Sequence, residues 1–186
     1  MYDERDQQSP TGRRRRAQVA LWTLGALWAA RSLQSFSNPD FDSPETVGDW
    51  FAVVSLSIAL GLLPVGVGIL LKHTNLGPLS VRSLSVASIA TAGTAAMSNI
   101  VEDGFGASWA GTTYLVGVLG TFLVLLVAAA GLAVRGPRLL ALVPLATVIG
   151  IVNLERGGGL VVLIAWGCLA LSRHSAPGMA TQKIQR

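Results

Sequence analysis

The stretch WFAVVSLSIALGLLPVGVGILL, from Trp50 to Leu71, decides the fold class of this chain. It holds 22 residues without a charge, and Ala110–Val134 is a second uncharged run of 25 residues. At about 1.5 Å per residue, a helix of either length crosses a hydrocarbon core of about 30 Å. Membrane β-strands alternate apolar and polar residues, whereas both runs are apolar on every face. The sequence therefore predicts an all-α membrane protein.

The rest of the chain agrees with this class. Hydrophobic residues make up 51% of the 186 residues and charged residues only 13%, and the mean hydropathy is +0.55, values typical of a membrane protein. Four more apolar segments predict helices over residues 17–35, 79–101, 138–153 and 158–172. We expect a six-helix transmembrane bundle built from three sequential helical hairpins. This domain covers residues 17–173, between a basic N-terminal tail (1–16) and a C-terminal tail (174–186).

The charged residues predict the orientation of these spans. With both termini in the cytoplasm, 12 of the 14 basic residues lie inside and seven of the ten acidic residues lie outside, as the positive-inside rule requires. We therefore expect a multi-pass plasma-membrane protein. The isoelectric point near 10.0 follows from this partition, so no nucleic-acid partner is needed to explain it. Arginine outnumbers lysine twelve to two, which is compatible with a bacterial source.

The run Arg13–Arg16 stands directly before the first apolar segment. It can hold the cytoplasmic end of the first helix, contact anionic lipid, or belong to an export signal. We favour the first interpretation. Cleavage of the first span as a signal peptide stays open, because Ala17–Ala30 has the length of a signal-peptide core.

Small and hydroxyl-bearing residues recur on the third predicted span at spacings of three and four. Helices in lipid associate through such residues, because small side chains let two backbones approach closely. We predict that this stripe packs against other helices and that the third span lies at the centre of the bundle. A hydrophilic path lined by the same hydroxyls is the alternative. The stripe comprises Ser80, Ser83, Ala87, Thr91, Thr94 and Ser98.

Polar residues on the predicted outer side form the candidate site. Three predicted outer turns each place an asparagine a few residues before an acid, in SNPDFD (37–42), SNIVED (98–103) and VNLERG (152–157). The outer side carries two predicted cations, one near the end of the first span and one in the last turn. Solvated turn residues are the alternative to a site. The residues predicted to bind a ligand or a partner are Arg31, Asn99, Glu102, Asp103, Asn153, Glu155 and Arg156.

The third hairpin is predicted to be shorter than the other two. A helix over the 16 residues 138–153 reaches about 24 Å, less than the hydrocarbon thickness of about 30 Å. We expect its outer turn to be drawn inward, so that Glu155 and Arg156 lie in a pit walled by the other hairpins. Arg156 would then pair with Glu102 or Asp103, because a charge at that depth is costly without a partner.

The absence of chemical motifs shapes the functional prediction. No Asp, Glu, Lys, Arg or His lies near the middle of a predicted span, whereas proton-coupled carriers keep ionisable groups there. The sequence has no zinc, haem or nucleotide-binding motif and no evident nucleophile–base pair, so we expect no cofactor, metal site or catalytic residue. It favours a non-enzymatic accessory, assembly or scaffold subunit that contacts the lipid bilayer and a membrane-protein partner or a second copy. A small-solute transporter or channel entered through the outer residues is the alternative.

Overall fold

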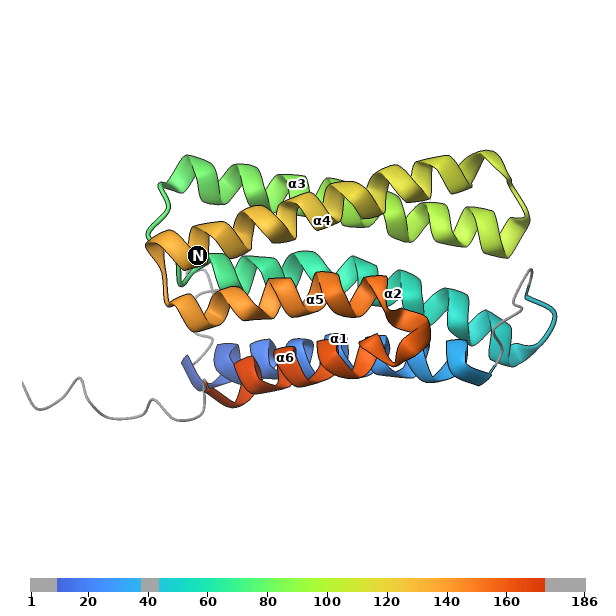
Figure 1. Cartoon of the computed structure of the whole chain (residues 1–186), viewed down its shortest axis with the longest axis horizontal. Coiled ribbons are helices and arrows are strands. Elements are labelled where there is room, and N and C mark those ends of the chain that lie inside the picture. Colours follow the sequence, from blue (N-terminus) through green and yellow to red (C-terminus); the bar gives the residue numbers. More distant parts are fainter. Residues whose placement is uncertain (1–9, 38–43, 173–186) are drawn as a thin grey trace, which may run out of the picture.

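The computed structural model describes residues 10–37 and 44–172, which form helices and no strands. The all-α prediction is confirmed for these residues. A π-helical turn, η2 (Ile100–Gly104), extends the third helix, and two 3₁₀ turns flank the fifth, η3 (Arg138–Ala141) and η4 (Leu154–Arg156). The α-helices are α1 (Pro10–Ser37), α2 (Val47–Leu71), α3 (Pro78–Asn99), α4 (Trp109–Arg135), α5 (Leu142–Val152) and α6 (Gly158–Ser172) (Figure 1).

Three of these helices are long and apolar enough to cross a membrane. They are α2, α3 with its continuation to Gly104, and α4. Helix α5 with η3, and helix α6, are apolar but shorter. Helix α1 is less apolar, because Gln18, Arg31 and Gln34 interrupt its hydrophobic residues. It begins at Pro10 rather than at residue 17, so the four arginines lie in its first turns; residues 1–9 and 174–186 of the predicted tails lie outside the described residues.

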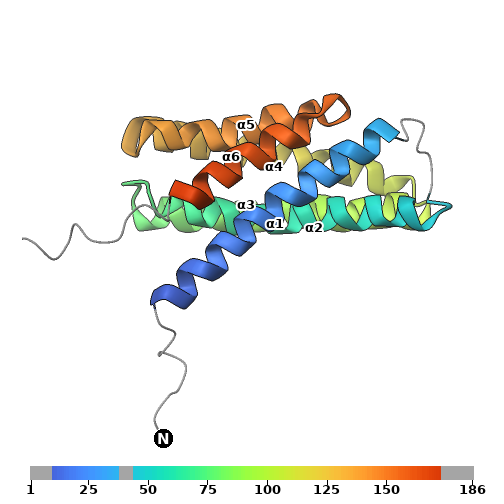
Figure 2. The ribbon, with the colours of Figure 1, turned by 90° about the horizontal axis from the view of Figure 1, so that it is seen from below.

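Helices that follow one another in sequence are neighbours in space, and each runs antiparallel to the next (Figure 1). Helix α6 then packs against α1, and this contact is as extensive as the one between α3 and α4. The predicted grouping into three hairpins therefore omits the main neighbour of α1, which is α6 rather than α2. Figure 2 shows that α1 crosses the bundle obliquely and that its N-terminal end projects away from the other helices.

Glycines make the contact between α1 and α6 close. A Cβ atom on Gly159 would collide with the carbonyl oxygen of Trp28, and a Cβ atom on Gly25 would lie 2.9 Å from the Cα atom of Leu163. Both neighbours are backbone atoms, which cannot rotate away as a side chain can. The two helices therefore pack backbone to backbone at these positions, as small residues permit in membrane helices.

Helix α2 is the most enclosed helix of the three long apolar ones. In the most apolar 18-residue stretch of each helix, 61% is buried in α2, compared with 33% in α3 and 39% in α4. The prediction that the third span lies at the centre is therefore wrong. The ring of Trp166 on α6 explains part of this enclosure, because it lies against Gly66 of α2, where a Cβ atom would be 2.6 Å from Cη2.

The predicted stripe on α3 is only partly in the interior. Ser98 is buried, Ala87, Thr91 and Thr94 are half-buried, and Ser80 and Ser83 are exposed. The fully buried residues of α3 are Ser88, Ala92, Ala95, Ala96, Ser98 and Asn99. The helix is thus rotated so that a neighbouring small-residue stripe faces the core.

Glycines of α4 meet α3 at close range. A Cβ atom on Gly117 would lie 2.6 Å from the amide nitrogen of Ala95, and one on Gly120 would lie 2.6 Å from Cγ2 of Thr91. The Thr91 hydroxyl donates to the carbonyl of Ala87 at 2.9 Å. A hydroxyl bonded to its own helix in this way needs no polar path beside it.

Described charges separate to the two ends of the bundle (Figure 1). The basic end, defined by the start of α1 and by the α2–α3 and α4–α5 connections, carries Arg13–Arg16, Lys72, Arg82, Arg135 and Arg138. The acidic end, at the opposite termini of the helices, carries all five described acids with Arg31 and Arg156. These acids are Glu45, Asp49, Glu102, Asp103 and Glu155.

Candidate functional site at the acidic end

The acid pair of SNIVED lies on η2, where α3 widens into a π-helical turn. Gly106 follows with a φ of +69°, and its amide donates to the carbonyl of Glu102 at 2.8 Å. A side chain is strained at such an angle, so glycine suits this position. The Glu102 carboxylate lies against Gly111 of α4, in the space that a Cβ atom would otherwise fill. Turns of the π type often occur at functional sites.

Arg31 on α1 approaches the same turn. Its positive charge acts on the Asp103 carboxylate, and the charges of Arg31, Glu102 and Asp103 all act on the hydroxyl of Tyr114 in α4. All four residues are partly buried. We call Arg31, Glu102, Asp103 and Tyr114 the Arg31 cluster. Helix α1 is thus brought next to η2 and α4, which lie far from it in the sequence, and both signs of charge come together.

Three polar side-chain atoms of α1, one of them on Arg31 of the cluster, are buried and have no hydrogen-bond partner among the described residues. They are Nε1 of Trp28, Nε of Arg31 and Oε1 of Gln34. The amide nitrogen of Gln34 does have a partner, because it donates to the carbonyl of Gly48 at 2.6 Å. An unpaired buried donor or acceptor costs about 1–3 kcal/mol. The two nitrogens can therefore donate to a polar or anionic group, whereas the Gln34 oxygen can only accept a hydrogen bond.

Asn99 belongs to the interior of the bundle rather than to the Arg31 cluster. Its side-chain nitrogen donates to the carbonyl of Val53 at 3.1 Å and to Oγ of Ser57 at 3.0 Å, and the residue is 3% exposed. These bonds connect α3 to α2. Asn153 also has a local role, because its side chain donates to the carbonyl of Ile149 at 2.8 Å and so caps α5.

Glu155 and Arg156 lie on η4, which contacts α1. Both are exposed on the α5–α6 turn, and Arg156 is not among the charges that act on Asp103. The α5–α6 turn does not reach as far along the bundle as the α3–α4 turn (Figure 1). It is attached to α1, because the Ser32 hydroxyl donates to the carbonyl of Leu154. The expected pit around an Arg156–acid pair is therefore not formed. Residues 38–42 of SNPDFD lie outside the described residues.

Reasoning from sequence missed Tyr114, Gln34 and Trp28. Tyr114 lies near the start of α4, and a tyrosine close to a helix end often has an apolar ring packed inside and a polar hydroxyl in wetter surroundings. Gln34 follows Arg31 by three positions and thus lies one turn further along α1. Both signals were present, but neither shows which helix the side chain faces.

No protein-family model matches the chain, and neither the curated proteins nor the solved structures include a significant match to it. Within residues 10–37 and 44–172, no group of three His, Cys, Asp or Glu side chains lies close enough to hold a metal ion. The functional argument therefore depends on the geometry of this chain alone.

Proposed function

We propose that this chain is a six-span plasma-membrane protein with both termini in the cytoplasm, which acts as a non-enzymatic accessory subunit. Its spans form three consecutive hairpins, and the α5–α6 hairpin adapts to the bilayer by local thinning. The separation of charges supports this orientation, since the basic end would face the cytoplasm. The subunit binds a transmembrane helix of its partner along the exposed face of α2.

Two glycines of α2 carry the proposal of a partner helix. A Cβ atom on Gly61 or on Gly68 would meet no atom within 4 Å, in contrast to Gly66, Gly117 and Gly159. Glycine inside a helix costs about 0.5–1 kcal/mol relative to alanine, and no contact with the described residues offsets that cost at these two positions. A partner helix would offset this cost, because small residues let it approach α2 closely.

The two glycines belong to a continuous seam on α2. The seam alternates spacings of four and three, the pattern with which two helices pack along their length. Its apolar side chains are 45–47% exposed. We call this the α2 seam; it comprises Val54, Ile58, Gly61, Val65 and Gly68.

Adding leucine side chains to the seam is expected to remove the partner. The variant Gly61→Leu/Gly68→Leu should retain about tenfold less partner when the full chain is purified from its native membranes in mild detergent, because overpacking costs about 1–3 kcal/mol. Its own melting temperature should not fall, since a Cβ atom at either position meets no described atom within 4 Å. Val65→Ile, which keeps the shape of the seam, is the matched control.

Retention of the partner by the double variant would contradict the proposal. A solute transporter or channel is the second candidate, favoured by the unpaired polar atoms Trp28 Nε1, Arg31 Nε and Gln34 Oε1. A polar path across the membrane is not favoured, because the described core is apolar, with Leu24, Leu60 and Leu63 at most 2% exposed. Uptake of a solute by vesicles that contain only this chain would favour the second candidate.

Single cysteines test the proposed orientation, in a chain where the exposed Cys168 is first replaced with serine. In intact cells, a membrane-impermeant maleimide should label cysteines at Glu45, Ser108 and Glu155. Cysteines at Asn75 and Pro137 should react only after permeabilisation.

The C-terminal tail gives the strictest check of the span number. Because six spans return the chain to the side on which it began, labelling at Ala180 from outside in intact cells would contradict the proposal. Labelling at Ala180 only after permeabilisation is the expected result.

A further inference from the structure

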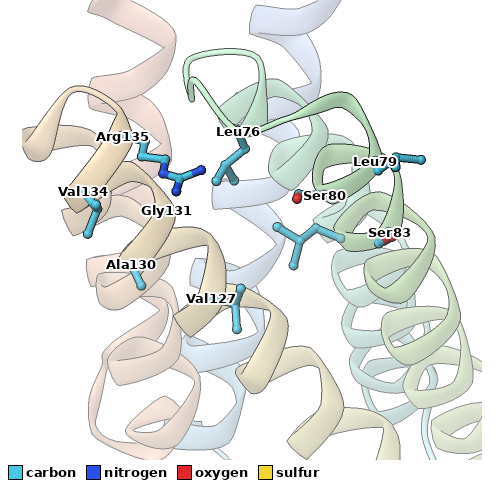
Figure 3. A pocket seen from close by; sticks show the side chains of 10 residues that line it. Leu76, Leu79, Ser80, Ser83, Val127, Ala130, Gly131, Val134 and Arg135 are labelled. Carbon is cyan, nitrogen blue, oxygen red and sulfur yellow. The ribbon is translucent and has the colours of Figure 1, made fainter.

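A groove of about 590 Å³ opens between the first half of α3 and the last half of α4 (Figure 3). Most of its lining is apolar, with Leu79 and Leu84 from α3, Val127, Ala130 and Val134 from α4, and Leu76 from the connection before α3. Its volume lies within the range of about 300–1,000 Å³ found for small-molecule sites. The groove therefore has the size and the chemistry to hold a hydrocarbon chain.

The packing of α3 and α4 explains why the groove exists. At Gly117 and Ala95 the two helices are in close contact, but near the basic end Leu76 packs between α4 and the start of α3. A Cβ atom on Gly131 would lie 3.0 Å from Cδ1 of Leu76. The amide of Asn75 also donates to the carbonyl of Arg135 at 2.8 Å, which attaches the connection to the end of α4. The groove is thus built from fixed elements.

One cation lies at the mouth of the groove. Figure 3 shows the side chain of Arg135 extending toward Leu76. Arg135 is exposed and is the last residue of α4. The first turn of α3 adds to the positive potential here, because its N-cap, Gly77, has no side chain to bond the free amides, and free amides attract anions.

We infer that the α3–α4 groove binds one acyl chain of an anionic phospholipid, with the phosphate at Arg135. Lys72 and Arg82 at the same end favour an anionic over a zwitterionic headgroup, because juxtamembrane cations attract anionic lipid. The inference requires that the chain is embedded in a bilayer, as proposed above. It does not depend on the partner helix at the α2 seam.

A second groove provides the internal comparison. It has a volume of about 320 Å³ and lies between α5 and α6, where Leu142, Ala146 and Ile164 are among its lining residues. No charged residue lines it. Both grooves can accommodate apolar chains, but only the α3–α4 groove combines an apolar lining with a cation that recognises a phosphate.

Native mass spectrometry of the full chain in a nonionic detergent tests this inference. Phosphatidylglycerol should bind in preference to phosphatidylcholine with the same acyl chains. Arg135→Gln should weaken phosphatidylglycerol binding about fivefold, since one cation near a membrane surface contributes about 1 kcal/mol. It should weaken phosphatidylcholine binding less, because the choline ammonium offsets part of the attraction between Arg135 and the phosphate. Ala130→Phe and Val134→Trp, which place rings in the groove, should weaken the binding of both lipids.

Two controls separate the groove from the general charge of the basic end. Arg138→Gln and Ala146→Phe should leave phosphatidylglycerol binding within twofold of the wild type. An equal loss with Arg138→Gln, or unchanged binding by both ring variants, would overturn the inference. So would binding of glycerol phosphate without acyl chains at a similar affinity, or a dimer of the chain that the ring variants dissociate.

Discussion

Trp166→Ala is expected to lower the free energy of unfolding by about 3–5 kcal/mol, as for other buried aromatic residues. Trp166 is 0% exposed, its ring lies against Gly66 of α2, and its Nε1 donates to Oγ1 of Thr147 in α5 at 3.0 Å. Alanine would leave a cavity where α2, α5 and α6 meet. Because lipid is as apolar as the ring, the loss comes from packing contacts rather than from exposure to water.

Unfolding by denaturant in detergent micelles measures this loss. Trp109→Ala is the matched control, because Trp109 is 68% exposed and its removal should change stability by less than about 0.5 kcal/mol. Thr147→Val isolates the hydrogen bond, and interhelical bonds of this kind average about 0.6 kcal/mol. Equal losses for Trp166→Ala and Trp109→Ala would show that α6 does not dock through this ring.

Gly159→Leu is expected to prevent α6 from docking on α1. Even the single carbon of Gly159→Ala would meet the carbonyl oxygen of Trp28 and lie 2.6 Å from Cβ of Ser32. Overpacking of this kind costs about 1–3 kcal/mol, and the larger leucine side chain should cost more than alanine. Because α6 is the main neighbour of α1, the first and last described helices would then separate.

Gly93→Ala is the matched control for this substitution. Gly93 lies inside α3, and a Cβ atom there would meet no atom within 4 Å. Alanine should leave the stability unchanged or raise it by up to about 1 kcal/mol through its higher helix propensity. If Gly159→Ala and Gly93→Ala have the same effect on the unfolding midpoint, α1 and α6 do not cross at Gly159.

The helical class and the helix positions could be predicted from the sequence. Trp50–Leu71 and Ala110–Val134 are uncharged over a length that suits a spanning helix, and α6 begins and ends at the predicted residues 158 and 172. The separation of basic and acidic residues to opposite ends of the helices could also be predicted, because Arg135 and Glu155 each stand beside the end of an apolar run. Apolar length and charge position are local properties of the chain, and they determine where it can meet water.

Only the tertiary structure determined which helices meet and which polar residues they bring together. Arg31 acts on Asp103, while Arg156 remains exposed on another turn, and α1 packs chiefly against α6. In an apolar solvent, residues that face lipid and residues that face another helix are both apolar, so hydrophobic periodicity does not identify the buried side. Gly61 and Gly159 are both glycines in apolar helices. A Cβ atom on Gly159 would meet a backbone carbonyl, whereas one on Gly61 would meet no described atom within 4 Å. Whether a small residue is a contact depends on the position of the neighbouring backbone, which lies far away in the sequence.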